Sequence, residues 1–77
     1  MTHVEIEYCV PCGFLDRAED VQHALLSSLG EHLDAVTLRT GDHGVFRVDV
    51  DGETVFDKAD DEFDVDAIVR DVRERAR

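Results

Sequence analysis

The spacing of apolar residues changes twice along the chain. Over residues 2–8 apolar side chains alternate with mostly acidic ones, which predicts a half-buried strand. Apolar residues then recur every three or four positions, which predicts a helix over residues 12–29 that ends before Gly30. The expected buried stripe of this helix contains Phe14, Ala18, Val21, Leu25 and Leu29, widened by Leu15, Gln22, Ala24 and Leu26.

The middle of the chain alternates again. Residues 33–39 read as a second strand, and the polar and glycine-rich residues 40–44 read as a turn. Two further alternating runs, 45–50 and 53–56, flank the pair Asp51-Gly52. An Asp-Gly pair between alternating runs indicates a β-hairpin, because both central positions of its tight turn need a positive φ.

The last part of the chain returns to helical spacing. Residues 57–62 form an acidic stretch that we expect to be a loop with a solvated surface rather than a cation site. A closing helix is expected over residues 65–76, with Asp64 as its N-cap. Its expected buried stripe is Val65, Ile68, Val69, Val72 and Ala76.

The order of elements is β-α-β-β-β-α, which predicts an α/β protein of the α+β sandwich type with one four-stranded mixed sheet and two helices. The first two strands are expected to be parallel with a right-handed crossover. If the third strand lies on the far side of the first, residues 40–44 must span two strand spacings, about 10 Å. That loop would then cross beside Cys9 and Cys12, whereas a plain hairpin of strands two and three would leave it remote. We favour the crossing, within a single domain over residues 1–77.

Composition limits the possible partners. The 77 residues carry 19 Asp and Glu against 8 Lys and Arg, a formal net charge of -11. Such a chain repels phosphate backbones and anionic lipids, so nucleic-acid and membrane partners are not expected. The lysine-poor acidic surface suits a halophilic source, and stability that stays flat from low to molar KCl would contradict that expectation. No signal peptide or membrane-spanning run is visible, so we expect a cytoplasmic location.

The chemistry is concentrated in the only two cysteines, Cys9 and Cys12, at the junction of the first strand and helix. Thiols beside a helix N-terminus are favoured as thiolates, which indicates a dithiol redox site. A buried inert pair is one alternative. A zinc half-site is another, although zinc needs four ligands and only His43 is placed to join the cysteines.

The chain resembles the selenoprotein W/T/H-type (Rdx) redox family, a small branch of the thioredoxin-like fold. The resemblance rests on three stretches: Val4-Glu5-Ile6-Glu7-Tyr8-Cys9-x-x-Cys12-Gly13, Gly44-x-Phe46-x-Val48-x-Val50-Asp51-Gly52, and Phe63-x-x-Asp66. It implies a thioredoxin-like domain with thiol redox activity. Family members often carry selenocysteine at the position that is Cys12 here. Thioredoxins place a cis-proline opposite their dithiol, and this chain has no proline outside the motif.

These observations predict a thiol-disulfide redox protein in which Cys9 attacks and Cys12 resolves the mixed disulfide. The family's selenium position points instead to Cys12 as the attacking group. We expect a monomer that needs no cofactor and no metal, with oxidised protein or small-molecule thiols and an external reductant as partners. A non-enzymatic redox-sensing interaction module is the alternative. His43 is either an exposed turn residue or a proton donor to the site.

Overall fold

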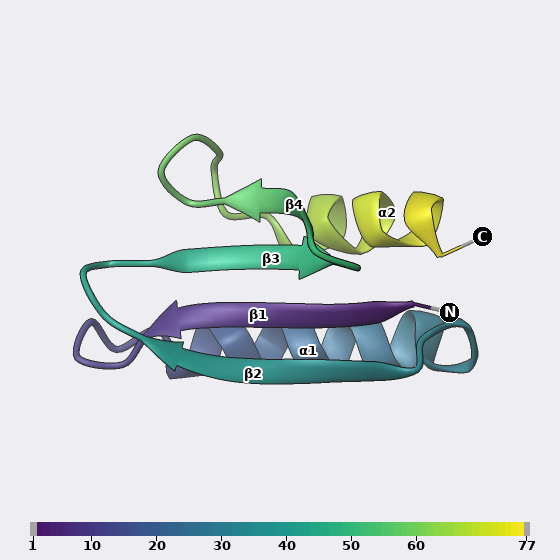
Figure 1. The fold of residues 1–77 in the computed structure, drawn as a ribbon, viewed down its shortest axis with the longest axis horizontal. Helices are drawn as coiled ribbons and strands as arrows, with labels where there is room; N and C mark the ends of the chain where they lie inside the picture. The colour runs from purple at the N-terminus through teal and green to yellow at the C-terminus, as the bar shows by residue number, and fades with distance from the viewer. Residues whose placement is uncertain (1, 77) are drawn as a thin grey trace.

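The computed structural model describes residues 2–76. Its elements follow the predicted order (Figure 1). They are β1 (His3–Cys9), α1 (Leu15–Leu29), a short 3-10 helix η1 (Gly30–His32), β2 (Ala35–Gly41), β3 (Phe46–Val50), β4 (Glu53–Asp57) and α2 (Val65–Arg75).

The four strands form one mixed sheet in the order β2-β1-β3-β4. β1 pairs with β2 in parallel and with β3 antiparallel, so β3 lies on the far side of β1 from β2. The loop from β2 to β3 therefore crosses the end of β1, as Figure 1 shows. This confirms the predicted mixed sheet and crossing loop, and the alternative hairpin of strands two and three is wrong.

The core lies between the sheet and both helices. The alternating residues Val4, Ile6 and Tyr8 of β1 are buried and stand opposite Val50, Val48 and Phe46 of β3 in the strand register. They form one cluster with buried residues of both helices, among them Ala18, Val21, Leu25, Ile68 and Val72. The other face of the sheet is polar, and there Arg47 pairs with Glu7 at 2.8 Å. The fold thus has two layers, with helices on one face of the sheet.

Two local signals in the sequence act as predicted. Asp51 and Gly52 both have positive φ, 51° and 86°, in the turn between β3 and β4. The Asp64 carboxylate accepts a hydrogen bond from the backbone N–H of Ala67 at 3.2 Å and so caps α2. Each signal acts on its own backbone, and Asp51 in addition accepts a hydrogen bond from the His3 N–H at 2.9 Å.

The predicted bounds of strand two are wrong by two residues. β2 covers Ala35–Gly41, and its pairing with β1 continues through Tyr8↔Thr40 and Cys9↔Gly41, so the ladder includes residues predicted as turn. α1 ends at Leu29 as expected, but Gly30 has φ −53° and starts η1. The ladder with β1 decides these bounds, because cross-strand pairing and packing outweigh a local preference for a turn.

The predicted width of the buried face of α1 is also wrong. Ala18, Val21, Leu25 and Leu29 are buried, but Leu15 and Leu26 are 46% and 47% exposed. Gln22, on the same side, is half-buried and its side-chain amide donates to the Val36 carbonyl at 3.1 Å.

None of the helices in residues 2–76 combines the length and the apolar content that a membrane-spanning helix needs.

Candidate dithiol site

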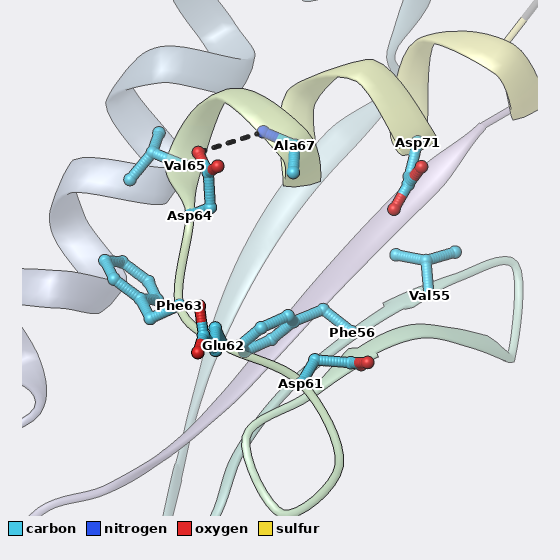
Figure 2. A pocket seen from close by; sticks show the side chains of 9 residues that line it. All are labelled: Val55, Phe56, Asp61, Glu62, Phe63, Asp64, Val65, Ala67 and Asp71. Carbon is cyan, nitrogen blue, oxygen red and sulfur yellow. Dashed lines mark hydrogen bonds between the residues drawn. The ribbon is translucent and has the colours of Figure 1, made fainter.

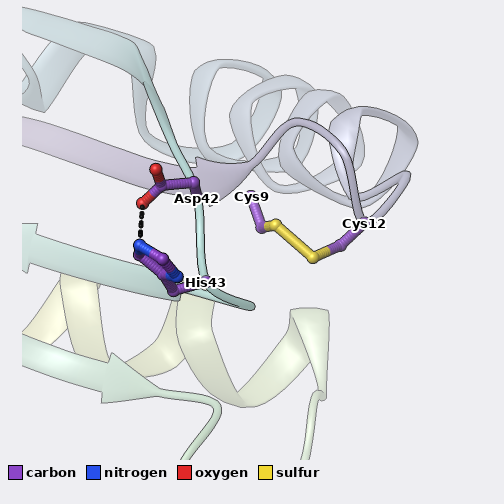
Figure 3. Close-up of a disulfide and its surroundings, with 4 residues drawn as sticks. All are labelled: Cys9, Cys12, Asp42 and His43. Atoms are coloured by element: carbon purple, nitrogen blue, oxygen red, sulfur yellow. Dashed lines mark ion pairs between the residues drawn. A yellow bond between two sulfur atoms is a disulfide. The ribbon is translucent and has the colours of Figure 1, made fainter.

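Cys9 and Cys12 lie at the end of β1, joined as a disulfide with their Cα atoms 5.3 Å apart (Figure 3). This separation lies within the usual range for bonded cysteines. Cys9 is the last residue of the central strand, and Cys12 follows in a turn over residues 10–13. A bend of the backbone at the end of the central strand therefore brings the two cysteines within bonding distance.

The turn is held by its own backbone. The Gly13 N–H donates to the Val10 carbonyl at 3.1 Å, and the Phe14 N–H donates to the Cys9 carbonyl at 3.4 Å. Gly13 has φ +77°, which a side chain would strain. Two such bonds around a left-handed glycine form the same pattern that ends helices in the Schellman motif.

This geometry corrects the predicted start of the first helix. α1 begins at Leu15 and not at Cys12, because a left-handed Gly13 cannot continue a right-handed helix. Pro11 is the second residue of the turn, a position that its fixed φ suits, and not a residue of the helix. The helix N-terminus still follows Cys12 closely, and Phe14 at the N-cap supplies no side-chain cap to it.

The two sulfur-bearing residues differ in exposure. Cys9 has no exposed surface, whereas Cys12 is exposed. The alternative of a buried inert pair therefore describes only one of the two residues. A second molecule meets Cys12 first, and Cys9 is accessible to it only through the bond to Cys12.

The loop from β2 to β3 is hydrogen-bonded to the backbone at the end of β1 at two points. The Cys9 N–H donates to the Val45 carbonyl at 2.7 Å, and the Val10 N–H donates to the Gly41 carbonyl at 3.1 Å. Gly41 ends β2 and Val45 precedes β3, so these bonds fix the loop directly beside the motif. The sequence-based prediction that this loop lies beside Cys9 is confirmed.

Gly41 is required for this close packing. A Cβ at Gly41 would lie 2.8 Å from Val45 Cγ1 and 2.9 Å from Glu7 Oε2. We expect Gly41→Ala to lower the free energy of unfolding by about 1–3 kcal/mol, as overpacking does. Gly30→Ala is the control, since a Cβ there meets nothing within 4 Å in a helical backbone, and it is expected to stabilise by ~0.5 kcal/mol. Urea unfolding of both variants measures the difference, and equal stabilities would contradict the packing argument.

His43 does not direct its ring at the disulfide. Its side chain is 92% exposed and its Nε2 lies 3.4 Å from Asp42 Oδ1. Figure 3 shows the ring turned toward Asp42 while the disulfide lies on the other side of the loop. The loop thus brings its backbone to the cysteines, and the His43 side chain faces solvent in this arrangement.

An aromatic cluster adjoins the turn. Phe14, directly after the motif, packs edge-on against Phe46 with ring centroids 6.0 Å apart, and Phe46 packs in the same way against Phe56 and Phe63. The Arg17 guanidinium lies 5.4 Å from the ring centroids of both Phe14 and Phe63, and Lys58 Nζ lies 5.4 Å from that of Phe14. The single lysine and one arginine of this acidic chain are thus held next to the motif by cation–π contacts.

The predicted acidic loop of residues 57–62 follows β4 and precedes α2, and its residues 58–62 are exposed as expected. Figure 2 shows a hollow lined by Asp61, Glu62, Asp64 and Asp71 together with Val55, Phe56, Phe63, Val65 and Ala67. Asp64 is engaged there in capping α2. Among residues 2–76 no three histidine, cysteine or carboxylate side chains are arranged to hold a metal ion. His43, the histidine that the sequence analysis considered as a third ligand, therefore forms no zinc site with Cys9 and Cys12 within residues 2–76.

Two features of the site had no interpretation in the sequence. The opposite exposure of Cys9 and Cys12 depends on the bend after β1, which alternation alone does not show. The approach of Lys58 to Phe14 joins residues 44 positions apart. Only the scarcity of lysine in an acidic chain marked Lys58 as unusual.

Three comparisons place the chain among known proteins. A model of the Rdx family matches residues 3–74. Migration and invasion enhancer 1 of Mus musculus is 34% identical over 58 residues, which cover 73% of this chain and 47% of that protein. The chain thus spans about half the length of this curated relative.

Solved structures match over nearly the whole chain. A crystal structure of a protein from Bordetella parapertussis superposes with a TM-score of 0.90 at 30% identity and covers 96% of each chain. The selenoprotein W-related protein of Vibrio cholerae superposes with a TM-score of 0.90 at 20% identity, over 99% of this chain and 98% of that one. The predicted thioredoxin-like α+β fold is confirmed by these matches.

Proposed function

This chain belongs to the Rdx family, and from that premise we propose that it is a thiol-disulfide redox protein that cycles its Cys9–Cys12 pair between dithiol and disulfide. Family membership indicates a redox function, and the structure holds the two cysteines as a disulfide. The single observation that carries the proposal is the exposure of Cys12 next to a buried Cys9. One sulfur meets a substrate and the other stands behind it to complete the exchange.

The reaction is a pair of thiol-disulfide exchanges. The Cys12 thiolate attacks one sulfur of a substrate disulfide, and the other substrate sulfur leaves as a thiolate that takes up a proton. Cys9 then loses its proton and attacks the Cys12 sulfur, which releases the second substrate thiolate and closes the Cys9–Cys12 disulfide. The substrate gains two electrons, and an external dithiol reductant returns them to the protein by the reverse exchange.

The exposures of the two residues support a different assignment from the sequence-based one, which took Cys9 as the attacking thiol. An attacking sulfur must approach the substrate disulfide along the S–S axis, and in the disulfide form Cys9 has no exposed surface from which to do so. A resolving cysteine has no such requirement, because its target is the neighbouring Cys12 sulfur. We therefore assign attack to Cys12 and resolution to Cys9.

The proposed exchange needs no cofactor, since both electrons come from thiols. We propose the cytoplasm as its compartment, where reductants keep thiols reduced and can reset the pair. The proposed substrates are oxidised protein or small-molecule thiols. The net charge of -11 favours a substrate or reductant with a basic surface, and this advantage declines as salt screens it.

The test is catalytic turnover. Protein at low concentration, supplied with dithiothreitol as reductant, is expected to reduce many equivalents of a model disulfide. A single stoichiometric oxidation with no further turnover would contradict catalysis and favour the redox-sensing module instead. Metal analysis of protein purified without chelators completes the test, because stoichiometric zinc that thiol-blocking reagents release would replace the redox proposal by zinc binding.

A further inference from the structure

Three features lie on one side of the molecule, and the exchange reaction uses only one of them, the position of Cys12. We propose that the outer edge of β2 and the adjoining side of α1 form a docking surface for an extended, basic, cysteine-containing segment of a client polypeptide, which pairs with β2 as a fifth strand. We call this the β2 edge surface, defined by Val10, Leu15, Glu19, Leu26 and the strand β2. The inference rests on the proposed exchange function and names its substrate class.

The first feature is an open strand edge. β2 lies at the end of the sheet order β2-β1-β3-β4, and no strand of the described residues pairs with its outer side. The Gly41 carbonyl points inward, since it accepts a hydrogen bond from Val10 at the end of β1. Backbone groups alternate in direction along a strand, so the N–H and C=O groups of Leu38 and Thr40 point outward. Such groups are a template for an added strand.

The second feature is a set of exposed apolar side chains beside that edge. Val10, Leu15 and Leu26 are the large apolar residues that remain exposed in residues 2–76, at 51%, 46% and 47%. Leu15 and Leu26 share one side of α1 with Gln22, because the spacings are seven and four residues. The hydrogen bond from Gln22 to the Val36 carbonyl fixes this side of α1 against the outer edge of β2. Val10 adjoins the other end of the strand through its bond to Gly41.

The third feature is the position of the reactive sulfur. Parallel pairing places the ends of β1 and β2 together, with Cys9 opposite Gly41. The turn that carries Cys12 begins at Val10, which is itself bonded to Gly41. A chain that pairs with Leu38 and Thr40 and continues past the end of β2 therefore runs along the turn that presents Cys12.

Charge decides between a client and a second copy of this chain. Two copies would bring net charges of -11 together. Within the surface, Glu19 lies between Leu15 and Gln22 on the same helical side, and Asp34 and Asp42 flank the two ends of β2. Arg39, the one cation of β2, is 3.5 Å from Glu5 on the polar face of the sheet. The surface is thus apolar with an acidic rim, which suits a basic segment with apolar side chains.

Binding of a synthetic peptide tests the surface without any redox step. The probe is a fluorescently labelled peptide with alternating valine and arginine residues and a serine in place of its cysteine, added to the oxidised protein. Leu15→Gln and Leu26→Gln are each expected to weaken binding about fivefold, the loss that corresponds to half a leucine side chain no longer being buried. The matched control is Ser27→Gln, an exposed position on the same helix but off this side, which is expected to leave binding unchanged.

Backbone pairing is tested by N-methylation of the peptide. Methyl groups on alternate residues are expected to abolish binding in one register and leave it nearly intact in the other, because only every second N–H faces β2. Equal affinity of all peptides for the wild type and both leucine variants would overturn the proposal that clients dock on the β2 edge surface. Sedimentation that shows a dimer disrupted by Leu26→Gln would also overturn it, in favour of a second copy.

The redox arm separates this inference from the function beneath it. The first substrate is the cysteine-containing peptide in a mixed disulfide with a small thiol, and the leucine variants are expected to reduce it about fivefold more slowly than the wild type. The second substrate is dithiobis(nitrobenzoate), a small disulfide, which the variants are expected to reduce at the wild-type rate. Equal rates on the peptide would contradict the docking surface and leave the exchange function standing. Peptide binding without reduction of either disulfide would contradict the exchange function and support the docking surface.

Discussion

Cys12→Ser is expected to lose all measurable turnover of a disulfide substrate. Cys12 is the exposed residue of the pair and the proposed attacking thiol, and a serine hydroxyl does not attack disulfides. Cys9→Ser is expected to fail differently, because the first exchange proceeds and no thiol remains to resolve it. The variant should therefore accumulate a covalent adduct between Cys12 and one half of the substrate. Intact-mass spectrometry after brief exposure to a model disulfide distinguishes the two.

The matched pair is also the control, since each variant removes one sulfur and keeps the backbone turn around Gly13. An adduct on Cys9 in the Cys12→Ser protein, formed as fast as the adduct on Cys12 in the other variant, would contradict the assignment of roles. It would restore Cys9 as the attacking thiol, as the sequence alone suggested.

Phe46→Ala is expected to cost about 3–5 kcal/mol of unfolding free energy. The side chain is 1% exposed and packs edge-on against Phe14, Phe56 and Phe63, with ring centroids 5.4–6.0 Å apart. A chain of 77 residues has a total stability of roughly 4–12 kcal/mol, so this loss removes about a quarter of that stability or more. Urea unfolding followed by circular dichroism measures it.

The control for Phe46 is Val10→Ala, which removes an apolar side chain that is 51% exposed and is expected to change stability by less than about 0.5 kcal/mol. A Phe46→Ala protein as stable as the control would contradict the view that the aromatic cluster holds the turn-bearing end of the sheet to the helices. The same variant bears on the site, because Phe14 at the entry to α1 loses its buried aromatic partner.

The features that sequence predicted well are those with a local cause. Alternation placed Val4, Ile6 and Tyr8 on the buried side of β1, and all three are there. Asp51-Gly52 specified its turn through positive φ, and Asp64 specified the start of α2 through its carboxylate. Each depends on a few neighbouring residues, so it can be predicted without knowing what packs above or beside them.

The features that sequence missed depend on what lies next to an element in space. Leu15 and Leu26 fit the helical period as well as Leu25 does, but α1 packs on β1 and β2 and no other part of residues 2–76 buries that side of it. Period alone cannot distinguish a covered side from an uncovered one. The start of α1 was missed for a backbone reason, because a proline two residues before Gly13 suits either a first helical turn or a β-turn.

The candidate site divides in the same way. The Cys-x-x-Cys spacing and the crossing loop were predictable from motif and loop length, and the backbone bonds from Cys9 to Val45 and from Val10 to Gly41 bear out the crossing. The orientation of the His43 side chain was not predictable from the sequence. An exposed ring can pair with any nearby carboxylate, and here it lies beside Asp42.

Reversible bond formation between Cys9 and Cys12 is the central claim, and a redox titration with intact-mass readout tests it most directly. Protein is equilibrated in buffers of defined dithiol-disulfide potential, then quenched with a thiol-alkylating reagent. The account predicts one two-electron transition within a single chain, in which the ratio of disulfide to dithiol changes tenfold for every ~30 mV. Protein that keeps two alkylatable thiols at every potential, or that forms only disulfides between chains, would contradict it.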